Sequence, residues 1–123
     1  MPKNTERTLK YLRAEGWEVG MVERWIKNPK HPAGGFRQDL FGFADILAFK
    51  PGYHDVMLVQ SCGQDFLAHK RKVLAADLSF EWTRCHRIML IGWRKVKKKR
   101  GGKQMVWRPR IEVWGGNSDV YLP

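Results

Sequence analysis

Hydrophobic and polar residues alternate along this 123-residue chain with periods that predict helices and strands in the order α-β-β-β-α-α-β-β. A helix is expected from Asn4, which can act as its N-cap, to about Glu15, where Gly16 can end it. Residues 17–26 alternate as a strand does. Residues 27–37 contain two prolines and two glycines, so they are expected to form an irregular basic loop.

The middle of the chain predicts a β-hairpin that is followed by two helices. Residues 43–49 and 56–62 are apolar runs on either side of a Pro-Gly turn, which is typical of paired strands. A helix is expected over about 64–76 and a shorter one over about 78–83. The longer helix is expected to turn one apolar stripe toward the sheet, made of Phe66, Leu67, Val73, Leu74 and Leu78.

A strongly basic segment lies between the last two predicted strands. Residues 88–93 and 105–114 are strand-like, and seven of the chain's 23 lysines and arginines lie between them at positions 94–103. The segment 86–114 is therefore expected to be a long hairpin with a basic tip. The whole pattern predicts one compact α/β domain over 1–114, followed by a C-terminal tail over 115–123.

The charge of the chain favours a polyanionic partner. It carries 23 lysines and arginines against 12 aspartates and glutamates, a formal net charge of +11. A basic hairpin suits the phosphate backbone of a nucleic acid better than a lipid surface, which usually receives a basic amphipathic helix. The alternative is a solvated loop without a partner.

Nothing in the sequence predicts a membrane span or an export signal. The apolar runs fall short of the roughly 18 to 20 residues that cross a bilayer. Cys62 and Cys85 are expected to be buried free thiols, because no paired metal-ligand spacing accompanies them. We therefore expect an intracellular, cytoplasmic protein that binds neither membrane nor zinc.

Asp45 is the most informative residue of the predicted hairpin, because it interrupts the apolar run 40–49. A carboxylate among such neighbours is costly unless it meets a cation, a metal ion or hydrogen-bond donors. A hairpin of this length can place Gln60, on the next strand, beside it. Asp45, the amide oxygen of Gln60, the backbone carbonyl of Ser61 and waters would form a hard-oxygen site suited to Mg²⁺ or Mn²⁺.

The run GFADILAF at 42–49, followed by a turn, MLVQSC at 57–62 and a helix, resembles the core of the PD-(D/E)XK nuclease superfamily. The closest likeness is to archaeal-type Holliday junction resolvases and related phage nucleases, and it covers roughly residues 4–75. The resemblance implies a restriction-endonuclease-like fold with a central mixed sheet flanked by helices. It also implies a Mg²⁺ or Mn²⁺ cofactor, branched DNA as the substrate, and a role in DNA recombination, with a phage-encoded protein among the expectations.

The resemblance carries four functional positions onto this chain. In the superfamily an acidic residue of the first helix, the Asp of the first hairpin strand, and the Glu and Lys of an E-x-K motif hold metal and activate water. By position these are Glu6, Asp45, Gln60 and Cys62. Gln60 keeps an oxygen ligand but lacks the negative charge. A thiol at position 62 cannot replace a cation that positions hydroxide and offsets phosphate charge, so either the lysine has moved or the enzyme is impaired.

The helix over 64–76 offers a replacement for the missing lysine. Lys70 is expected near the centre of the apolar stripe, where an ammonium group needs an anionic partner or must reach out to water. Lys70 is therefore the predicted catalytic cation, and His69 and Lys72 are the alternatives. A plainer alternative is that Lys70 packs at the edge with its amine in water.

Three further acidic residues rank below the two strand residues. Asp39 is a predicted metal ligand that could instead cap the strand or pair with Arg37. Glu23 is expected to be half-buried, where a salt bridge would satisfy it as well as a catalytic role. Glu6, in the first helical turn, is a predicted catalytic metal ligand or simply a carboxylate favoured by the helix dipole.

Basic residues are expected to surround the metal site and bind DNA phosphates, with affinity that falls as salt rises. No base-reading motif is visible, so DNA structure is the expected recognition feature. A branched junction has two symmetry-related cleavage points, which predicts a homodimer through Trp82 or the strands at Trp93 and Trp107. The predicted DNA-binding residues are Lys27, Lys30, Arg37, Arg71, Lys72, Arg94, Lys97, Lys98, Lys99, Arg100 and Lys103.

Three functions agree with these observations. A metal-dependent endonuclease acting on branched DNA is favoured by Asp45, Gln60, Glu6 and the basic surroundings. A degenerate nuclease fold that binds DNA without cutting it is favoured by the loss of the motif lysine at Cys62. A basic protein-binding or RNA-binding module is the third, and it predicts no effect of metal.

Overall fold

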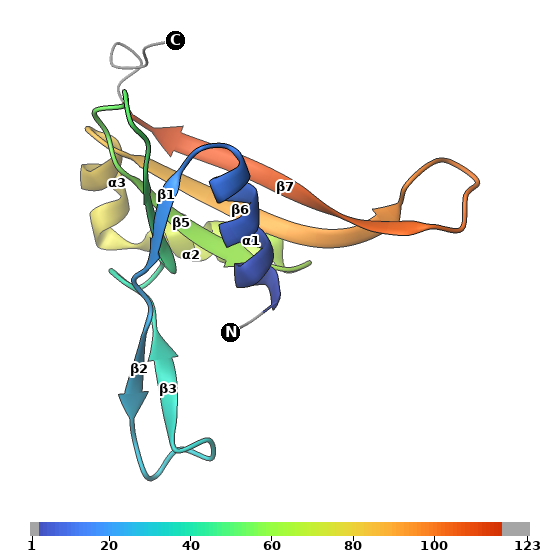
Figure 1. Ribbon diagram of the computed structural model, residues 1–123. Coiled ribbons are helices and arrows are strands. Elements are labelled where there is room, and N and C mark those ends of the chain that lie inside the picture. Colours follow the sequence, from blue (N-terminus) through green and yellow to red (C-terminus); the bar gives the residue numbers. More distant parts are fainter. Residues whose placement is uncertain (1–2, 117–123) are drawn as a thin grey trace.

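Residues 3–116 are described by the computed structural model, in which a central sheet lies between two layers of helices (Figure 1). The order of types agrees with the sequence prediction except for two additional strands in the N-terminal half. The elements are α1 (Lys3–Ala14), β1 (Glu18–Met21), β2 (Arg24–Lys27), β3 (Gly35–Gln38), β4 (Ile46–Phe49), β5 (Met57–Cys62), α2 (Phe66–Ala75), α3 (Asp77–Thr83), β6 (Arg87–Lys97) and β7 (Met105–Gly115).

Five strands form a mixed sheet in the order β1-β4-β5-β6-β7. The neighbours β5 and β6 are parallel, and α2 and α3 connect them; the other neighbouring pairs are antiparallel. Every residue of β5 is buried, as expected for the central strand of a sheet that is covered on both faces. Gln60 and Ser61 therefore lie in the middle of the domain.

The helices cover the two faces of the sheet separately (Figure 1). α1 packs its buried leucines against one face, and α2 and α3 lie against the other. This confirms the predicted α/β domain with a central mixed sheet flanked by helices. The α1 face is packed by Leu9, Leu12, Ile46, Val59 and Ile91, and the opposite face by Phe43, Leu58, Val73 and Ile88.

The segment predicted as one strand over 17–26 is divided between two sheets. β1 pairs with β4 in the main sheet, whereas β2 pairs with β3 in a separate two-stranded sheet. β3 begins within the segment predicted as an irregular loop, so the prediction of one strand was wrong and the irregular loop is confined to residues 28–34. Alternation shows which positions are half-exposed, but it does not reveal that the chain bends between Met21 and Arg24. The β2–β3 arm (24–38) projects away from the main sheet (Figure 1).

The predicted apolar stripe of α2 is only partly correct. Phe66 and Val73 are buried, but Leu67, Leu74 and Leu78 are 53%, 58% and 48% exposed. The stripe was counted along one straight helix, whereas α2 ends before position 78 and the chain continues into α3 with its own axis. A shorter helix turns a narrower face toward the sheet.

Other local predictions also differ from the structure. Asn4 lies within α1, and its side-chain oxygen accepts a hydrogen bond from the Arg7 guanidinium at 2.7 Å, so it does not act as the predicted N-cap. Cys62 is buried as expected, but Cys85 is exposed in the turn after α3. Gly115 belongs to β7, and the rest of the predicted tail, except Gly116, lies outside the described residues.

The last two strands form a long antiparallel ladder, from the Arg87–Gly115 pair to the Lys97–Met105 pair. Its distal part extends beyond the rest of the sheet and carries the basic tip (Figure 1). We refer to residues 87–115 as the β6–β7 hairpin. Among the described residues, no helix is long and apolar enough to cross a membrane.

Candidate functional site

A tight turn between β3 and β4 folds Asp39 back toward Asp45. Leu40 and Ala44 exchange two backbone hydrogen bonds of 2.9 Å, which closes the turn. Phe41, inside the turn, has a φ of +57°, a left-handed conformation that is unfavourable for a bulky residue. The closed turn places Asp39 and Asp45 on the two sides of a short β-bridge.

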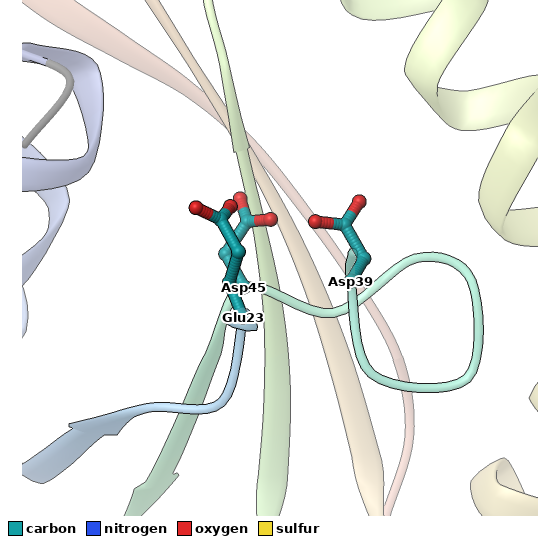
Figure 2. Close-up of side chains that lie close together, drawn as sticks. All are labelled: Glu23, Asp39 and Asp45. Carbon is teal, nitrogen blue, oxygen red and sulfur yellow. The ribbon is translucent and has the colours of Figure 1, made fainter. Parts of the chain in front are cut away.

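Glu23 completes a cluster of three carboxylates with Asp39 and Asp45 (Figure 2). One carboxylate oxygen from each residue lies within 4.8 Å of those of the others. Glu23 is positioned where the chain leaves β1, and the adjacent Val22 amide donates a 2.9 Å hydrogen bond to the backbone carbonyl of Asp45. Asp45 is buried, and the other two are half-buried. We call these three residues the acid cluster.

Glu23 was not among the metal ligands predicted from the sequence. The signal that pointed to it was its position on the same face of the alternating segment as Trp17 and Val19, which made it a half-buried acid. The sequence offered a salt bridge as an equal explanation, and Arg37 does lie 3.4 Å from Glu23. The convergence with Asp39 and Asp45 depends on the bend after β1.

Asp45 is held by hydrogen-bond donors from the central strand. Its Oδ2 accepts the backbone amide of Ser61 at 2.9 Å and the Nε2 of Gln60 at 3.0 Å. Its own backbone amide donates to the carbonyl of Val59 at 2.9 Å. The expected proximity of Asp45 and Gln60 is therefore observed, and the carboxylate has a fixed position.

Burial is the main cause that raises the pKa of Asp45 from its usual 3.8 to about 8. Its hydrogen bond with Asp39 and the charges of Asp39 and Glu23 act in the same direction, whereas the Ser61 amide opposes them. Carboxylates this close repel one another when ionised. Without a cation, the buried member of the acid cluster therefore keeps a proton near neutral pH.

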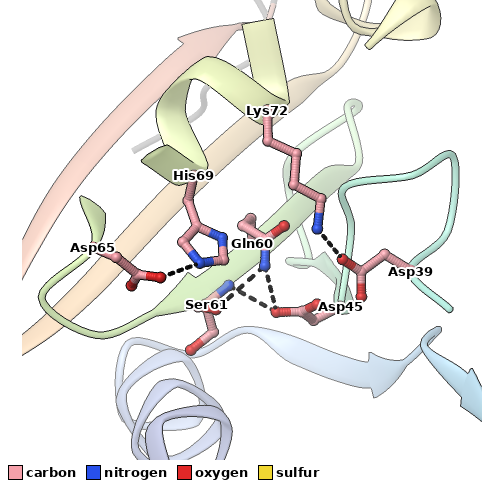
Figure 3. A network of polar contacts seen from close by, with 7 residues as sticks. All are labelled: Asp39, Asp45, Gln60, Ser61, Asp65, His69 and Lys72. Atoms are coloured by element: carbon pink, nitrogen blue, oxygen red, sulfur yellow. Dashed lines mark hydrogen bonds and ion pairs between the residues drawn. The ribbon is translucent and has the colours of Figure 1, made fainter. Parts of the chain in front are cut away.

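Two basic side chains pair with the outer members of the acid cluster. The Nζ of Lys72, from α2, lies 2.7 Å from Oδ2 of Asp39 (Figure 3). The Nη1 of Arg37, from β3, lies 3.4 Å from Oε1 of Glu23. A metal ion at the acid cluster would compete with these two ion pairs, which lowers the affinity expected for it.

Gln60 has an acceptor atom that the described residues leave unpaired. Its Nε2 donates to Asp45 and to the backbone carbonyl of Ser61, at 3.0 and 3.2 Å, while its Oε1 is buried without a hydrogen-bond partner. An unpaired buried acceptor is costly. A half-turn of the amide would direct the oxygen toward Asp45. Three carboxylates and an amide oxygen are ligands that Mg²⁺ or Mn²⁺ accept, so the residues fit the predicted cofactor.

The structure separates the lysine and histidine candidates of α2. Lys70 Nζ lies 3.0 Å from Oε2 of Glu112 on β7, so it is not brought to the acid cluster. Lys72 does reach it. His69 lies beside Gln60 (Figure 3). Its Nε2 is 2.9 Å from Oδ2 of Asp65, and the Nδ1 of His69 is buried without a partner among the described residues.

Two positions carried over from the nuclease motif lie outside the acid cluster. Glu6 is exposed on α1 and does not belong to it. Cys62 packs against Phe66 and Leu90, and burial raises the pKa of its thiol to about 12, with a further contribution from nearby acidic charges. The thiol is therefore neutral at physiological pH and serves packing.

All the predicted DNA-binding residues are exposed, and they form three groups. One group follows the β2–β3 arm and another lies on α2. The third and largest lies on the β6–β7 hairpin, which projects in a different direction from the β2–β3 arm (Figure 1). In this order the groups are Lys27, Lys30 and Arg37; Arg71 and Lys72; and Arg94, Lys97, Lys98, Lys99, Arg100 and Lys103.

No protein-family model, curated protein or solved structure matches this chain.

Proposed function

We propose that this protein is a divalent-metal-dependent DNA endonuclease of the PD-(D/E)XK type, with branched DNA as its preferred substrate. The observation that carries the proposal is the acid cluster, in which Glu23, Asp39 and the buried Asp45 converge beside Gln60. The central mixed sheet between two helical layers is compatible with a restriction-endonuclease-like fold. The exposed basic residues supply an attractive surface for phosphates.

The acid cluster would hold Mg²⁺ or Mn²⁺, with the amide oxygen of Gln60 as a further ligand. When bound, such an ion activates water and offsets the charge of the phosphodiester. The Ser61 amide keeps Asp45 in position through its 2.9 Å hydrogen bond. The carbonyl of Ser61, a predicted ligand, already accepts the Gln60 amide, so it becomes available only if that amide turns.

Lys72 takes the role of the missing motif lysine in this proposal. Its ammonium group lies 2.7 Å from Asp39, at the edge of the acid cluster, and Asp39 orients it. Lys70 is engaged by Glu112 on β7. A cation fixed beside the reacting phosphate stabilises the negative charge that develops on its oxygens. Lys72 can supply this cation from a helix, whereas Cys62 cannot supply it from the strand.

The proposed substrate has two symmetry-related cleavage points, so we propose that the protein acts as a homodimer. Of the tryptophans predicted at the interface, Trp93 is 7% exposed and packs inside the single chain. Trp82 is half-buried and donates its indole N–H to the carbonyl of Arg87 at 2.8 Å. Trp107, which is 44% exposed, is the most accessible of the three. Light scattering with and without a four-way junction measures the stoichiometry.

A DNA-binding protein without nuclease activity is the second candidate. It is favoured by the two ion pairs, because Lys72 and Arg37 already neutralise Asp39 and Glu23. Such a protein would bind a junction tightly, and its binding would not depend on Mg²⁺ or Mn²⁺.

The test incubates a synthetic four-way junction and a matched linear duplex with the protein and Mg²⁺ or Mn²⁺. We expect junction cleavage that is lost with EDTA and in Asp45→Asn. The matched control is Glu18→Gln, which removes an exposed carboxylate on β1. Cleavage that survives Asp45→Asn would exclude the acid cluster as the catalytic site. Tight binding without cleavage by the unaltered protein would select the second candidate.

A further inference from the structure

Three arginines on the stem of the β6–β7 hairpin are not used by the proposed catalytic site. Arg94 lies directly opposite Arg108, and Arg110 is two residues further along β7. Opposite residues, and residues two apart on a strand, share one face of a sheet. Trp93, which directly precedes Arg94 in β6, points to the opposite face, where its indole N–H donates to Thr8 of α1. Arg94, Arg108 and Arg110 therefore share the α2 side of the hairpin, and we call them the arginine face.

A pocket of about 280 Å³ opens beside the arginine face, where β5 ends and α2 begins. Among the described residues, its lining contains the two arginines Arg94 and Arg110 together with Gln64 and Lys95, and it contains no Asp or Glu. Concave shape and convergent cationic groups are properties of a site for a small anionic group.

Glycine at position 92 is required by the packing beneath this pocket. A Cβ on Gly92 would lie 2.7 Å from Cδ2 of Phe66 and 3.1 Å from the carbonyl oxygen of Gly63. The ring of Phe66 is thus able to lie close to the sheet, and the guanidinium of Arg110 stacks over it at 4.2 Å. A stacked guanidinium has a restricted orientation, which reduces the entropy lost when it binds a ligand.

Two acidic residues that are close in sequence to the lining of this pocket are already paired with other side chains. Glu112 shares the α2 side of β7, but its carboxylate is paired with Lys70 at 3.0 Å. Asp65, before α2, is paired with His69. Like charges directly opposite on adjacent strands, such as Arg94 and Arg108, are unfavourable unless an anion joins them. Phosphate, like carboxylate, is an anion that guanidinium groups bind in bidentate fashion.

We propose that this pocket and the arginine face bind a phosphate group of a nucleic-acid backbone, as an anchoring subsite separate from the acid cluster. The proposal depends on the proposed function only for the identity of the polymer. Gly63, which lines the pocket, follows Gln60 by three residues, a separation of roughly 10 Å along the strand. The subsite and the acid cluster are therefore close enough to contact different phosphates of one nucleic acid.

The experiment measures binding of a fluorescent four-way junction by anisotropy, in EDTA and over a series of salt concentrations. The variants are Arg94→Gln, Arg108→Gln and Arg110→Gln, with Arg13→Gln, an exposed cation of α1, as the matched control. In each test variant the logarithm of the binding constant should fall less steeply with the logarithm of the salt concentration, by about 0.9 in slope, and binding should weaken several-fold. Arg110→Lys, which keeps the charge but not the planar fork, should bind with intermediate affinity.

A second part of the experiment distinguishes the source of the phosphate. Inorganic phosphate and chloride are compared as competitors at equal ionic strength. Extra displacement by phosphate that is lost in Arg110→Gln supports the subsite and shows that a free phosphate group is sufficient. Displacement equal to that by chloride, together with the slope changes, supports the subsite with the backbone phosphodiester as its ligand.

Equal slopes in the three test variants and in Arg13→Gln would overturn the subsite, because they would show only a general effect of charge. Thermal melting of each variant verifies that it is folded. All of these measurements are made without metal, so they are independent of cleavage. A protein that cuts the junction but shows no arginine effect would disprove the subsite alone, and one that shows the effect but does not cut would disprove the nuclease alone.

Discussion

The backbone amide of Ser61 donates a 2.9 Å hydrogen bond to the buried carboxylate of Asp45, which joins two neighbouring segments at the centre of the domain. The amide lies on β5, and Asp45 directly precedes β4. A backbone donor is available in every protonation state, so the carboxyl group keeps its position whether or not it carries a proton. Protonation then changes the charge of the acid cluster more than its geometry.

The first prediction concerns stability and pH in the absence of metal. The pKa of Asp45 is raised to about 8 in the folded protein, against 3.8 for an unperturbed carboxyl. Between these values the folded state binds more protons than the unfolded state, so the contribution of this group to stability decreases as pH rises from about 4 to about 8. Each pKa unit corresponds to about 1.4 kcal/mol. We expect this loss in denaturant titrations in EDTA.

Asp45→Asn is the variant that isolates this effect. The amide is neutral at every pH, and its oxygen can still accept the Ser61 hydrogen bond. In EDTA at pH 8 the variant should be more stable than the unaltered protein, and the difference should shrink toward pH 5. Glu18→Gln is the control and should follow the unaltered protein. A pH profile of stability that is the same with Asp and Asn at position 45 would contradict the raised pKa.

The second prediction concerns binding of a divalent cation. Mg²⁺ or Mn²⁺ at a hundredfold excess over its dissociation constant should stabilise the fold by about 2.7 kcal/mol, measured as an increase in Tm. The increase should be larger at pH 8 than at pH 6, because the proton of Asp45 competes with the ion at the lower pH. Asp39→Asn and Asp45→Asn should both reduce it.

Glu18→Gln should keep the full metal-dependent increase in Tm, since its carboxylate is exposed on β1. An increase that is unchanged in Asp39→Asn and Asp45→Asn would place the ion elsewhere on the protein. Isothermal titration with Mn²⁺ on the same four proteins provides an independent measurement of the affinity.

The third prediction separates two lysines of α2. Lys72→Ala should reduce junction cleavage by about 10²-fold or more, because it removes the cation beside Asp39. Lys70→Ala should cause a smaller loss, since its ammonium group lies beside Glu112 on β7 and not at the acid cluster. Single-turnover rates at saturating protein measure the cleavage step without the contribution of binding. A greater loss in Lys70→Ala would return the catalytic role to the lysine predicted from the sequence.

The fourth prediction concerns the buried polar contact between α1 and the sheet. The hydroxyl of Thr8 lies 2.8 Å from the Ser61 hydroxyl and accepts the indole N–H of Trp93 at 2.8 Å. Thr8→Val keeps the shape but leaves both groups without this partner, at a cost of roughly 1–3 kcal/mol for each group left unpaired. Denaturant unfolding should show the loss as a lower midpoint.

Thr83→Val is the matched control for Thr8→Val. The hydroxyl of Thr83 donates to the carbonyl of Phe80 on the surface, where water can replace it. Its removal should change stability by no more than about 0.5 kcal/mol. Comparable losses in both variants would show that the buried position of Thr8 has no special importance.

Much of the site could be predicted where its geometry is local. Asp45 stands out because it is a charge in an apolar run, and strands joined by a short turn pair readily, which brings Gln60 close. Glu23 and Asp39 were harder to rank. Their contribution depends on the bend that separates β1 from β2 and on the turn at 40–44, and alternation along the chain reports neither.

The sequence by itself determined the α/β class, the buried carboxylate and the basic β6–β7 hairpin, because periodicity and charge runs are properties of neighbouring positions. Only the tertiary structure decided which acids meet Asp45, that Lys72 and not Lys70 reaches them, and that Arg94, Arg108 and Arg110 share one face. The physical reason is that these contacts join segments far apart in the chain. Their geometry is fixed by strand register, by the direction of α2 and by two backbone bends.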